Sequence, residues 1–217
     1  YFLSGMDSFK RLSSYQFMQV LQKAKEFNIP VLLHAEDAGF VEEATRVEQA
    51  KGSDWENYYR SRPEIAEILA VQDAISMARH TGAELHIVHV ATARAAELIK
   101  DIENVTGETC PHYLAFSKED FEQHGSALKT APVVKSEENK NELWGFLREG
   151  GIDFMASDHA PAPEEKKNTG SVWTDYSGIP GNPTLLPYLF SEGYAQKRLN
   201  LSRFLELISE NAARRYG

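Results

Sequence analysis

Four short apolar segments, each ending near a polar residue that can bind a metal ion or a proton, place the strongest constraint on the fold of this chain. Each segment is rich in β-branched or large side chains and is bounded by turn signals, which is the pattern of a buried strand. The segments cover residues 30–34, 85–90, 107–114 and 152–157. Helical patterns lie around them at residues 14–27, 63–81, 92–102, 136–148, 184–196 and 202–214. This alternation predicts parallel strands joined by right-handed crossovers.

Two α/β architectures fit such an alternation, an open doubly wound sheet and a barrel. An open nucleotide-binding sheet would show a glycine-rich turn between a strand and a helix, and the sequence has none. Instead, polar side chains follow one strand end after another, which is how a barrel builds its active site. These residues are His34, His89, His112 and Asp158. The pattern favours a (β/α)8 TIM-type barrel.

The barrel is expected to be incomplete in this chain. A full eight-stranded barrel takes about 250 residues, whereas this chain has 217 and shows four strand patterns plus a strand end at residues 1–4. We therefore expect about strands 4 to 8 with their helices. They would form one partial barrel domain over residues 1–217, within a longer protein.

The charge balance and the single cysteine narrow the class of protein. A net charge of -9 argues against a nucleic-acid partner, which would require a basic surface. No apolar run reaches the roughly 18 residues of a membrane span, and no charged-then-apolar leader is present. Cys110 is the only cysteine, which excludes an intramolecular disulfide and a multi-cysteine zinc site and fits a reducing compartment. We expect a cytoplasmic protein with neither a membrane nor a nucleic-acid partner.

His34, His89 and Asp158 form the candidate metal site. His34 taken alone is more simply a hydrogen-bonded core or loop histidine. Asp158, however, follows a mostly apolar run, and a carboxylate there is too costly to bury without a metal ion or a hydrogen-bonding partner. Two imidazoles and a carboxylate at successive strand ends suit Zn²⁺ or a similar ion. Such a metal would lower the pKa of bound water toward about 7 and polarise a carbonyl, with Asp158 acting as base and later as acid.

The alternation of side chains along a strand distinguishes His86 from His89. Residues two apart share a face, so Ile87 and His89 are predicted to point one way and His86 and Val88 the other. Because His89 lies at the strand end, it is the candidate ligand. His86 is expected to pack toward the helices and to be structural.

Three further residues have two interpretations each. His112, in the run Cys-Pro-His-Tyr, is expected to support the ligands from behind or to be structural, with a place at the cavity mouth as the alternative. His159 either orients substrate or braces Asp158. Cys110 is expected to be a packed small hydrophobe rather than a nucleophile.

The segments after the last strand supply the remaining candidates. Residues 178–183 are dense in glycine and proline, and Gly178, Pro180 and Gly181 are expected to bring backbone groups close to the substrate. Residues 162–175 are expected to form a mobile polar loop, either a solvated connection or a lid over the site.

Six short motifs, in order and almost end to end, give the chain a resemblance to the cyclic amidohydrolases, a family that includes dihydroorotases, allantoinases and hydantoinases. The motifs are Val31-Leu-Leu-His-Ala-Glu-Asp37, Ser61-Arg-Pro-Glu-Ile-Ala-Glu67, Leu85-His-Ile-Val-His89, Glu108-Thr-Cys-Pro-His-Tyr-Leu114, Ser157-Asp-His-Ala-Pro161 and Gly178-Ile-Pro-Gly181. The resemblance implies a metal-dependent hydrolase that opens a cyclic amide.

The resemblance also implies a set of metal ligands. His34 and His89 resemble two ligands of the more buried metal, and Asp158 resembles the ligand and base on the eighth strand. The family's other ligands, a His-x-His pair and a carboxylated lysine, do not lie in this sequence, and the lysine would fall just before Tyr1. One or two Zn²⁺ ions are implied, with Co²⁺ or Mn²⁺ as alternatives. We also expect a homo-oligomer, either a dimer or a tetramer.

Departures from the dihydroorotase pattern favour allantoinase activity. Dihydroorotases carry a histidine where this chain has Ala162, and an Asn-Pro-Pro segment where it has Lys129-Thr-Ala-Pro-Val133. Both changes remove hydrogen-bond donors for a carboxylated substrate. The Thr-Cys-Pro-His-Tyr run and Trp144 resemble allantoinases, whereas the Asp-His-Ala-Pro and Ser-Gly-Ile-Pro-Gly segments resemble dihydroorotases.

Dihydroorotase and hydantoinase activities are therefore the enzymatic alternatives. The non-enzymatic alternative is a catalytically inactive homologue that serves as a scaffold. Retention of His34, His89 and Asp158 argues against that alternative.

Overall fold

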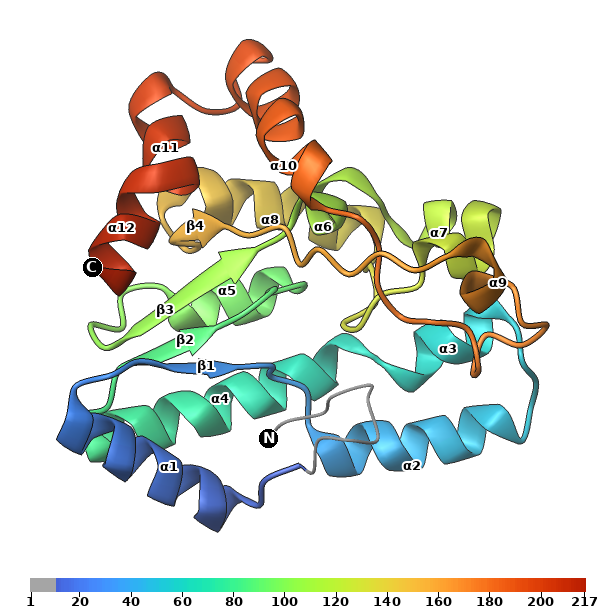
Figure 1. Cartoon of the computed structure of the whole chain (residues 1–217), viewed down its shortest axis with the longest axis horizontal. Coiled ribbons are helices and arrows are strands. Elements are labelled where there is room, and N and C mark those ends of the chain that lie inside the picture. Colours follow the sequence, from blue (N-terminus) through green and yellow to red (C-terminus); the bar gives the residue numbers. More distant parts are fainter. Residues whose placement is uncertain (1–10) are drawn as a thin grey trace.

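Four parallel strands, in chain order, form the sheet of the computed structural model, which describes residues 11–217 (Figure 1). They are β1 (Val31–Leu33), β2 (Leu85–Ile87), β3 (Val105–Thr109) and β4 (Phe154–Met155). A doubly wound sheet reverses its strand order at a switch point, whereas here each new strand adds to the same side, as in a barrel. The prediction of an α/β fold with a parallel sheet is confirmed. The strand end predicted at residues 1–4 lies outside the described residues.

Helices connect the strands and continue beyond the last one. The α-helices are α1 (Ser14–Phe27), α2 (Ala38–Gln49), α3 (Trp55–Ser61), α4 (Glu64–Thr81), α5 (Ala93–Ile99), α6 (Pro111–Ala115), α7 (Lys118–His124), α8 (Glu137–Glu149), α9 (Glu164–Lys167), α10 (Asn182–Tyr188), α11 (Leu201–Leu205) and α12 (Asn211–Tyr216). A 3₁₀ turn, η1 (Gly125–Leu128), and two π-helical segments, η2 (Leu189–Ala195) and η3 (Glu206–Glu210), complete the set. None of the helices described is long and apolar enough to cross a membrane.

The helices divide between the flank of the sheet and the end of its strands. Helices α4, α5 and α8 run along the sheet, and α1 packs against α4 (Figure 1). Helices α3, α7 and α9 gather on the side toward which the strands point (Figure 1). The loops at the carboxyl ends of the strands therefore carry structure of their own, where a barrel places its active site.

The hydrophobic patterns predicted the starts of four helices to within one residue. Helix α1 has the predicted bounds, and α4, α5 and α8 each begin one residue later than predicted. The patterns at residues 184–196 and 202–214 correspond to α10 with η2 and to α11 with η3 and α12. Helices α2 and α3, between β1 and α4, were not predicted.

The strand predicted over residues 107–114 is wrong in its second half. β3 ends at Thr109, and Pro111 occupies the first turn of α6. Proline is favoured there because its ring fixes a helical φ and its missing N–H would have no helical partner in any case. Cys110 is the N-cap residue of this helix. His112 therefore lies in a helix that follows the strand, not at the end of the strand.

Helix α1 shows how its local sequence fixes both of its ends and its packing face. Ser13 and Gln16 form a reciprocal capping box at the N-terminus, and Asn28 closes the helix in the left-handed conformation. Phe17 and Leu21 lie on the buried face and belong to the main hydrophobic core. The neighbouring Val20 is 40% exposed, whereas Leu21 is 0% exposed.

The different burial of Leu21 and Val20 predicts that the same change, to alanine, will affect stability at one position and not at the other. Leu21→Ala should reduce the free energy of unfolding by about 2–5 kcal/mol, because it removes buried methyl groups and leaves a cavity. Val20→Ala, one residue away on the outer face, should change it by no more than about 0.5 kcal/mol. Urea denaturation of the two variants measures both values. Equal losses would contradict the packing of α1 described here.

Candidate functional site

A cavity of about 800 Å³ opens where the strands end. His34 follows β1 by one residue, His89 follows β2 by two, and Asp158 follows β4 by three. Parallel strands end at the same edge of a sheet, so these three side chains line one cavity although they are distant in the chain. Other lining residues come from β3, from α3 and from the loops, and include Glu108, Tyr58, Arg62, Lys129, Trp173 and Gly178.

His34 and His89 are in direct contact at the edge of this cavity. The Nδ1 atom of His34 lies 3.0 Å from the Nε2 atom of His89, and the rings meet edge to face at a centroid distance of 4.6 Å. The other ring nitrogen of His34, Nε2, lies 2.8 Å from Glu36 Oε2. A carboxylate only accepts hydrogen bonds, so this contact assigns a proton to Nε2, and in the neutral ring Nδ1 then carries the lone pair and faces His89.

The two facing nitrogens fit adjacent positions around one metal ion. Two nitrogen ligands of a tetrahedral zinc ion lie about 3.3–3.4 Å apart, given bonds of about 2.0–2.1 Å. The 3.0 Å between His34 and His89 is close to this spacing. Burial, together with His34, holds the pKa of His89 well below its usual range, which favours the neutral imidazole that a metal requires. Within residues 11–217, however, no group of three or more His, Cys, Asp or Glu side chains is arranged to hold a metal.

Asp158 lines the same cavity in a partly desolvated position. Burial raises the pKa of its carboxyl group above the usual value, against an opposing effect of His34, and Glu108 raises it further. A raised pKa makes a carboxylate a better proton acceptor near neutral pH. The structure thus gathers His34, His89 and Asp158 at one cavity, with the two imidazoles in direct contact.

The backbone at His89 and at Asp158 is left-handed. Their φ angles are 42° and 43°, in a region that residues other than glycine rarely adopt. Such a conformation costs about 1–3 kcal/mol and persists where surrounding structure holds it, most often at functional sites. The sequence did not predict it, although histidine and aspartate are among the residues other than glycine that adopt positive φ more often than most.

The predicted orientation of His86 is wrong. His86 is the register partner of Leu32, which lines the cavity, so its side chain lies on the cavity side of the sheet, where it also contacts the Tyr216 ring of α12 edge to face, with centroids 6.0 Å apart. It stacks on Phe154 with centroids 4.8 Å apart and an interplanar angle of 3°. His89 reaches the cavity in spite of the alternation because β2 ends at Ile87 and the left-handed backbone redirects the chain.

Sequence reasoning missed Glu36 and Arg62. Glu36 is 1% exposed and accepts hydrogen bonds from His34 and, through the same carboxylate oxygen, from the Arg62 guanidinium. Burial raises the pKa of Glu36, but Arg62, the His34 hydrogen bond and Lys135 outweigh that effect and lower it to about 2. A signal was present in the sequence, since an extended backbone places residues two apart, such as His34 and Glu36, on one face.

The predicted substrate-binding segment divides between two cavities. His159 Nδ1 accepts hydrogen bonds from the backbone N–H groups of Gly181 and Asn182, both at 3.1 Å. Gly178 lines the large cavity with His34, whereas Pro180 and Gly181 line a separate cavity of about 400 Å³. A Cβ atom on Gly181 would lie 1.9 Å from the carbonyl oxygen of Ser157, so this position needs glycine for close approach.

His112 also lines the smaller cavity, together with Phe116, Tyr188 and Leu128. Its side chain is 3% exposed, and its Nε2 atom is buried with no hydrogen-bond partner among residues 11–217. Burial lowers its pKa to about 3, so the ring is neutral. The structure does not bring His112 into the contact between His34 and His89.

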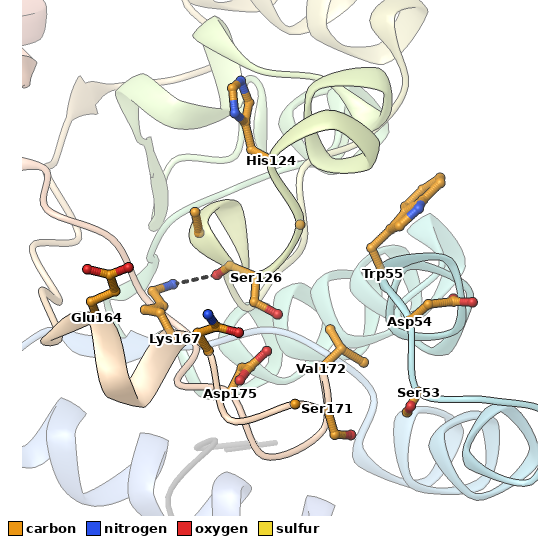
Figure 2. A pocket seen from close by; sticks show the side chains of 14 residues that line it. Ser53, Asp54, Trp55, His124, Ser126, Glu164, Lys167, Ser171, Val172 and Asp175 are labelled. Carbon is orange, nitrogen blue, oxygen red and sulfur yellow. Dashed lines mark hydrogen bonds between the residues drawn. The ribbon is translucent and has the colours of Figure 1, made fainter.

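Figure 2 shows a third cavity, of about 550 Å³, between the start of α3, η1 and the segment after β4. Lys167 reaches across it and donates hydrogen bonds to the carbonyl oxygens of Ser126 and Lys129, at 3.0 Å and 3.2 Å. Burial lowers the pKa of Lys167 to about 8, with Asp175 opposing the shift. The segment after β4 is thus tied to η1.

The same segment is also tied to the connection between α2 and α3. Trp173 Nε1 donates to the carbonyl oxygen of Gly52 at 2.8 Å, and the N–H of Val172 donates to that of Ser53 at 3.1 Å. Val172 is buried, and Trp173 lines the large cavity. The expectation of a solvated loop over residues 162–175 is therefore wrong for its second half, which forms cavity wall.

Comparisons with known proteins agree with this arrangement. The chain is 38% identical to an allantoinase of Deinococcus radiodurans, over 99% of this chain and 49% of that protein. It is 37% identical to an allantoinase of Rubrobacter xylanophilus, over 99% of this chain and 48% of that protein. The chain spans about half the length of these curated relatives. No family model matches it.

Solved structures of enzymes with related names also superpose on this chain. An L-hydantoinase (dihydropyrimidinase) from Arthrobacter aurescens superposes with a TM-score of 0.94 at 30% identity, covering 98% of this chain and 49% of that one. A dihydroorotase from Campylobacter jejuni superposes with a TM-score of 0.70 at 20% identity, over 97% of this chain and 55% of that one, and shares the fold. The fold is therefore part of a TIM-type barrel. Over nearly its whole length the chain is therefore similar to cyclic amidohydrolases, and the resemblance based on its motifs is confirmed.

The close approach at Gly181 predicts a matched pair of glycine substitutions. Gly181→Ala should destabilise the protein by about 1–3 kcal/mol, because the new methyl group meets the backbone of Ser157. Gly145→Ala should stabilise it by about 0.5–1 kcal/mol, because Gly145 lies inside α8 with nothing within 4 Å of the added Cβ. Thermal unfolding of both variants tests the pair, and a neutral Gly181→Ala would show that the close approach is absent.

The environment of Lys167 predicts a pH-dependent contribution to stability. Its pKa falls from 10.5 to about 8 on folding, so between these values the unfolded chain holds this proton more tightly than the folded one. The unfolded state then binds more protons, and the contribution of Lys167 to stability rises with pH through that window. The unfolding free energy of wild type relative to Lys167→Gln should increase from about pH 8 to pH 10.5. A flat difference in urea denaturation across this range would contradict it.

Proposed function

We propose that the protein containing this chain is a metal-dependent hydrolase that opens a cyclic amide ring, with allantoin as its substrate. The contact between His34 Nδ1 and His89 Nε2, at the edge of a cavity that Asp158 also lines, is the observation that carries the proposal. Two relatives of 38% and 37% identity are named allantoinase, which supports this choice of substrate.

The chain's own residues supply distinct parts of the chemistry. His34 and His89 would hold the metal, and a bound divalent metal supplies the Lewis acidity that activates water and polarises a carbonyl. Asp158 would accept a proton from the attacking water as its oxygen adds to the amide carbonyl carbon. It would then return that proton to the ring nitrogen as the carbon–nitrogen bond breaks. The products are a carboxylate and an N–H group, with the second proton of the water released to solvent.

Two cationic side chains line the cavity, and each has a partner in its wall. The ammonium of Lys129 donates a hydrogen bond to the carbonyl oxygen of Asp175. Its pKa is lowered to about 8, chiefly by burial. The Arg62 guanidinium donates to Glu36. Dihydroorotase and hydantoinase activities are the alternatives to allantoinase.

A ring-opening assay on the full-length protein separates these substrates. Allantoin, dihydroorotate and a hydantoin are compared side by side, and allantoin is expected to give the highest kcat/KM. Much faster turnover of dihydroorotate would overturn the assignment of substrate while leaving the hydrolase class intact. The cytoplasmic location and the homo-oligomer, a dimer or tetramer, are part of the same proposal, and sedimentation of the full-length protein tests the oligomer.

Metal analysis separates the enzyme from a catalytically inactive scaffold. Full-length protein purified without chelators should retain zinc, cobalt or manganese, measured by elemental analysis, and should lose its activity when the metal is removed. Protein that carries no such metal and regains no activity with any of the three would exclude the hydrolase.

Asp158→Asn in the full-length enzyme should reduce kcat by at least about 10²–10⁴-fold, because an amide cannot accept the proton from water. Most of the bound metal should remain, as measured by elemental analysis of the same sample. Asp101→Asn is a suitable control, because Asp101 is exposed, lies outside the cavity and has a left-handed backbone that asparagine tolerates. Near-normal activity of Asp158→Asn would remove Asp158 as the base.

A further inference from the structure

We propose that Glu36 and Arg62 form a buried positioning pair that sets the tautomer and ring orientation of His34. This inference rests on the proposed function, because it concerns how His34 is presented to a metal. Neither residue belongs to the ligand set that the motifs implied. Each acts through His34 and not by contact with the reacting atoms.

The pair is anchored through a single carboxylate oxygen. Glu36 Oε2 lies 2.8 Å from His34 Nε2 and also accepts a hydrogen bond from the Arg62 guanidinium. Glu36 is 1% exposed and Arg62 is 9% exposed, so water does not compete freely for these contacts. An ion pair buried to this degree has a high desolvation penalty and is weak evidence for a stabilising role alone. The contact between Glu36 and His34, a candidate metal ligand, provides a functional reason for burying the ion pair.

Arg62 is itself held from two sides. Lys135 Nζ donates a hydrogen bond of 2.8 Å to the carbonyl oxygen of Arg62. The Arg62 guanidinium carbon lies 5.5 Å from the centre of the Tyr58 ring, a cation–π distance. Tyr58 in turn donates to the carbonyl oxygen of Thr130 at 2.9 Å. The Tyr58 ring and the Glu36 carboxylate therefore position the guanidinium, and Lys135 holds the main chain of the same residue.

The pair determines whether Nδ1 of His34 carries a proton. Because the Glu36 carboxylate only accepts, His34 Nε2 must carry a proton, and in the neutral ring Nδ1 presents its lone pair 3.0 Å from His89 Nε2. A glutamine at position 36 has an amide NH₂ group that can donate to Nε2 instead. That exchange would move the ring proton to Nδ1, where it blocks metal binding. Partners of this kind typically change metal affinity about 10–100-fold.

Metal affinity of the full-length protein tests the pair. Glu36→Gln should weaken zinc binding about 10–100-fold in competition with a chelator and should alter the visible spectrum of the cobalt-substituted protein. Glu36→Asp, which keeps an accepting carboxylate, should recover part of the affinity. Glu48→Gln is the matched control, because Glu48 is also buried and paired, with Lys51, but lies outside the cavity. Its zinc affinity should equal that of wild type.

Two results would overturn the pair, and both leave the proposed function standing. One is wild-type affinity and an unchanged cobalt spectrum in Glu36→Gln. The other is an equal loss in Glu36→Gln and Glu48→Gln, which would indicate general destabilisation. If wild type itself binds no metal, the proposed function fails instead.

A direct measurement decides the case if Glu36→Gln does not fold or if wild type binds no metal. Nitrogen-15 NMR of the His34 ring in the metal-free wild-type protein should show the proton on Nε2 and an unprotonated Nδ1. A proton on Nδ1 would overturn the pair, because the Glu36 contact would then not set the tautomer.

Discussion

Parallel pairing of all four strands is the constraint on which the site depends, because it places every strand end at one edge of the sheet. The register sets Leu33 beside Ile87, and the next few residues of each strand then carry His34 and His89 to within 3.0 Å. A slip of one residue in either strand would turn its side chains to the opposite face. The register that sets Leu33 beside Ile87, together with the left-handed backbone at His89, therefore fixes the relative position of the two imidazoles.

Around this pair the protein buries charge that a stability argument alone would not favour. Glu36 and Arg62 pair with each other, while Glu67 accepts hydrogen bonds from the backbone N–H groups of Ala91 and Thr92. Burial raises the pKa of Glu67, with Lys135 opposing that shift. Replacing such groups by apolar residues often stabilises a protein. Their presence beside the cavity is consistent with a site in which ligand geometry is obtained at some expense of stability.

The sequence predicted the parts of this structure that follow from periodicity. The bounds of α1 and the starts of α4, α5 and α8 follow from apolar spacing and capping residues, and the positions of His34, His89 and Asp158 at strand ends follow from the apolar runs before them. What could not be predicted depends on non-local or irregular features. Partners such as Glu36 and Arg62 are set by tertiary contact. Helices α2 and α3 were missed although each begins at an aspartate N-cap, Asp37 and Asp54. His86 was misassigned because strict alternation was extended past the end of β2.

The left-handed backbone at His89 and Asp158 has a consequence for protein engineering. Transferring this site to another barrel requires more than three side chains at three strand ends. The recipient must also bend its main chain at two of those ends and must be stable enough to absorb the conformational cost. A recipient with regular strands would deliver the correct functional groups in the wrong direction. Suitable recipients should therefore be chosen by their backbone torsions before any ligand is introduced.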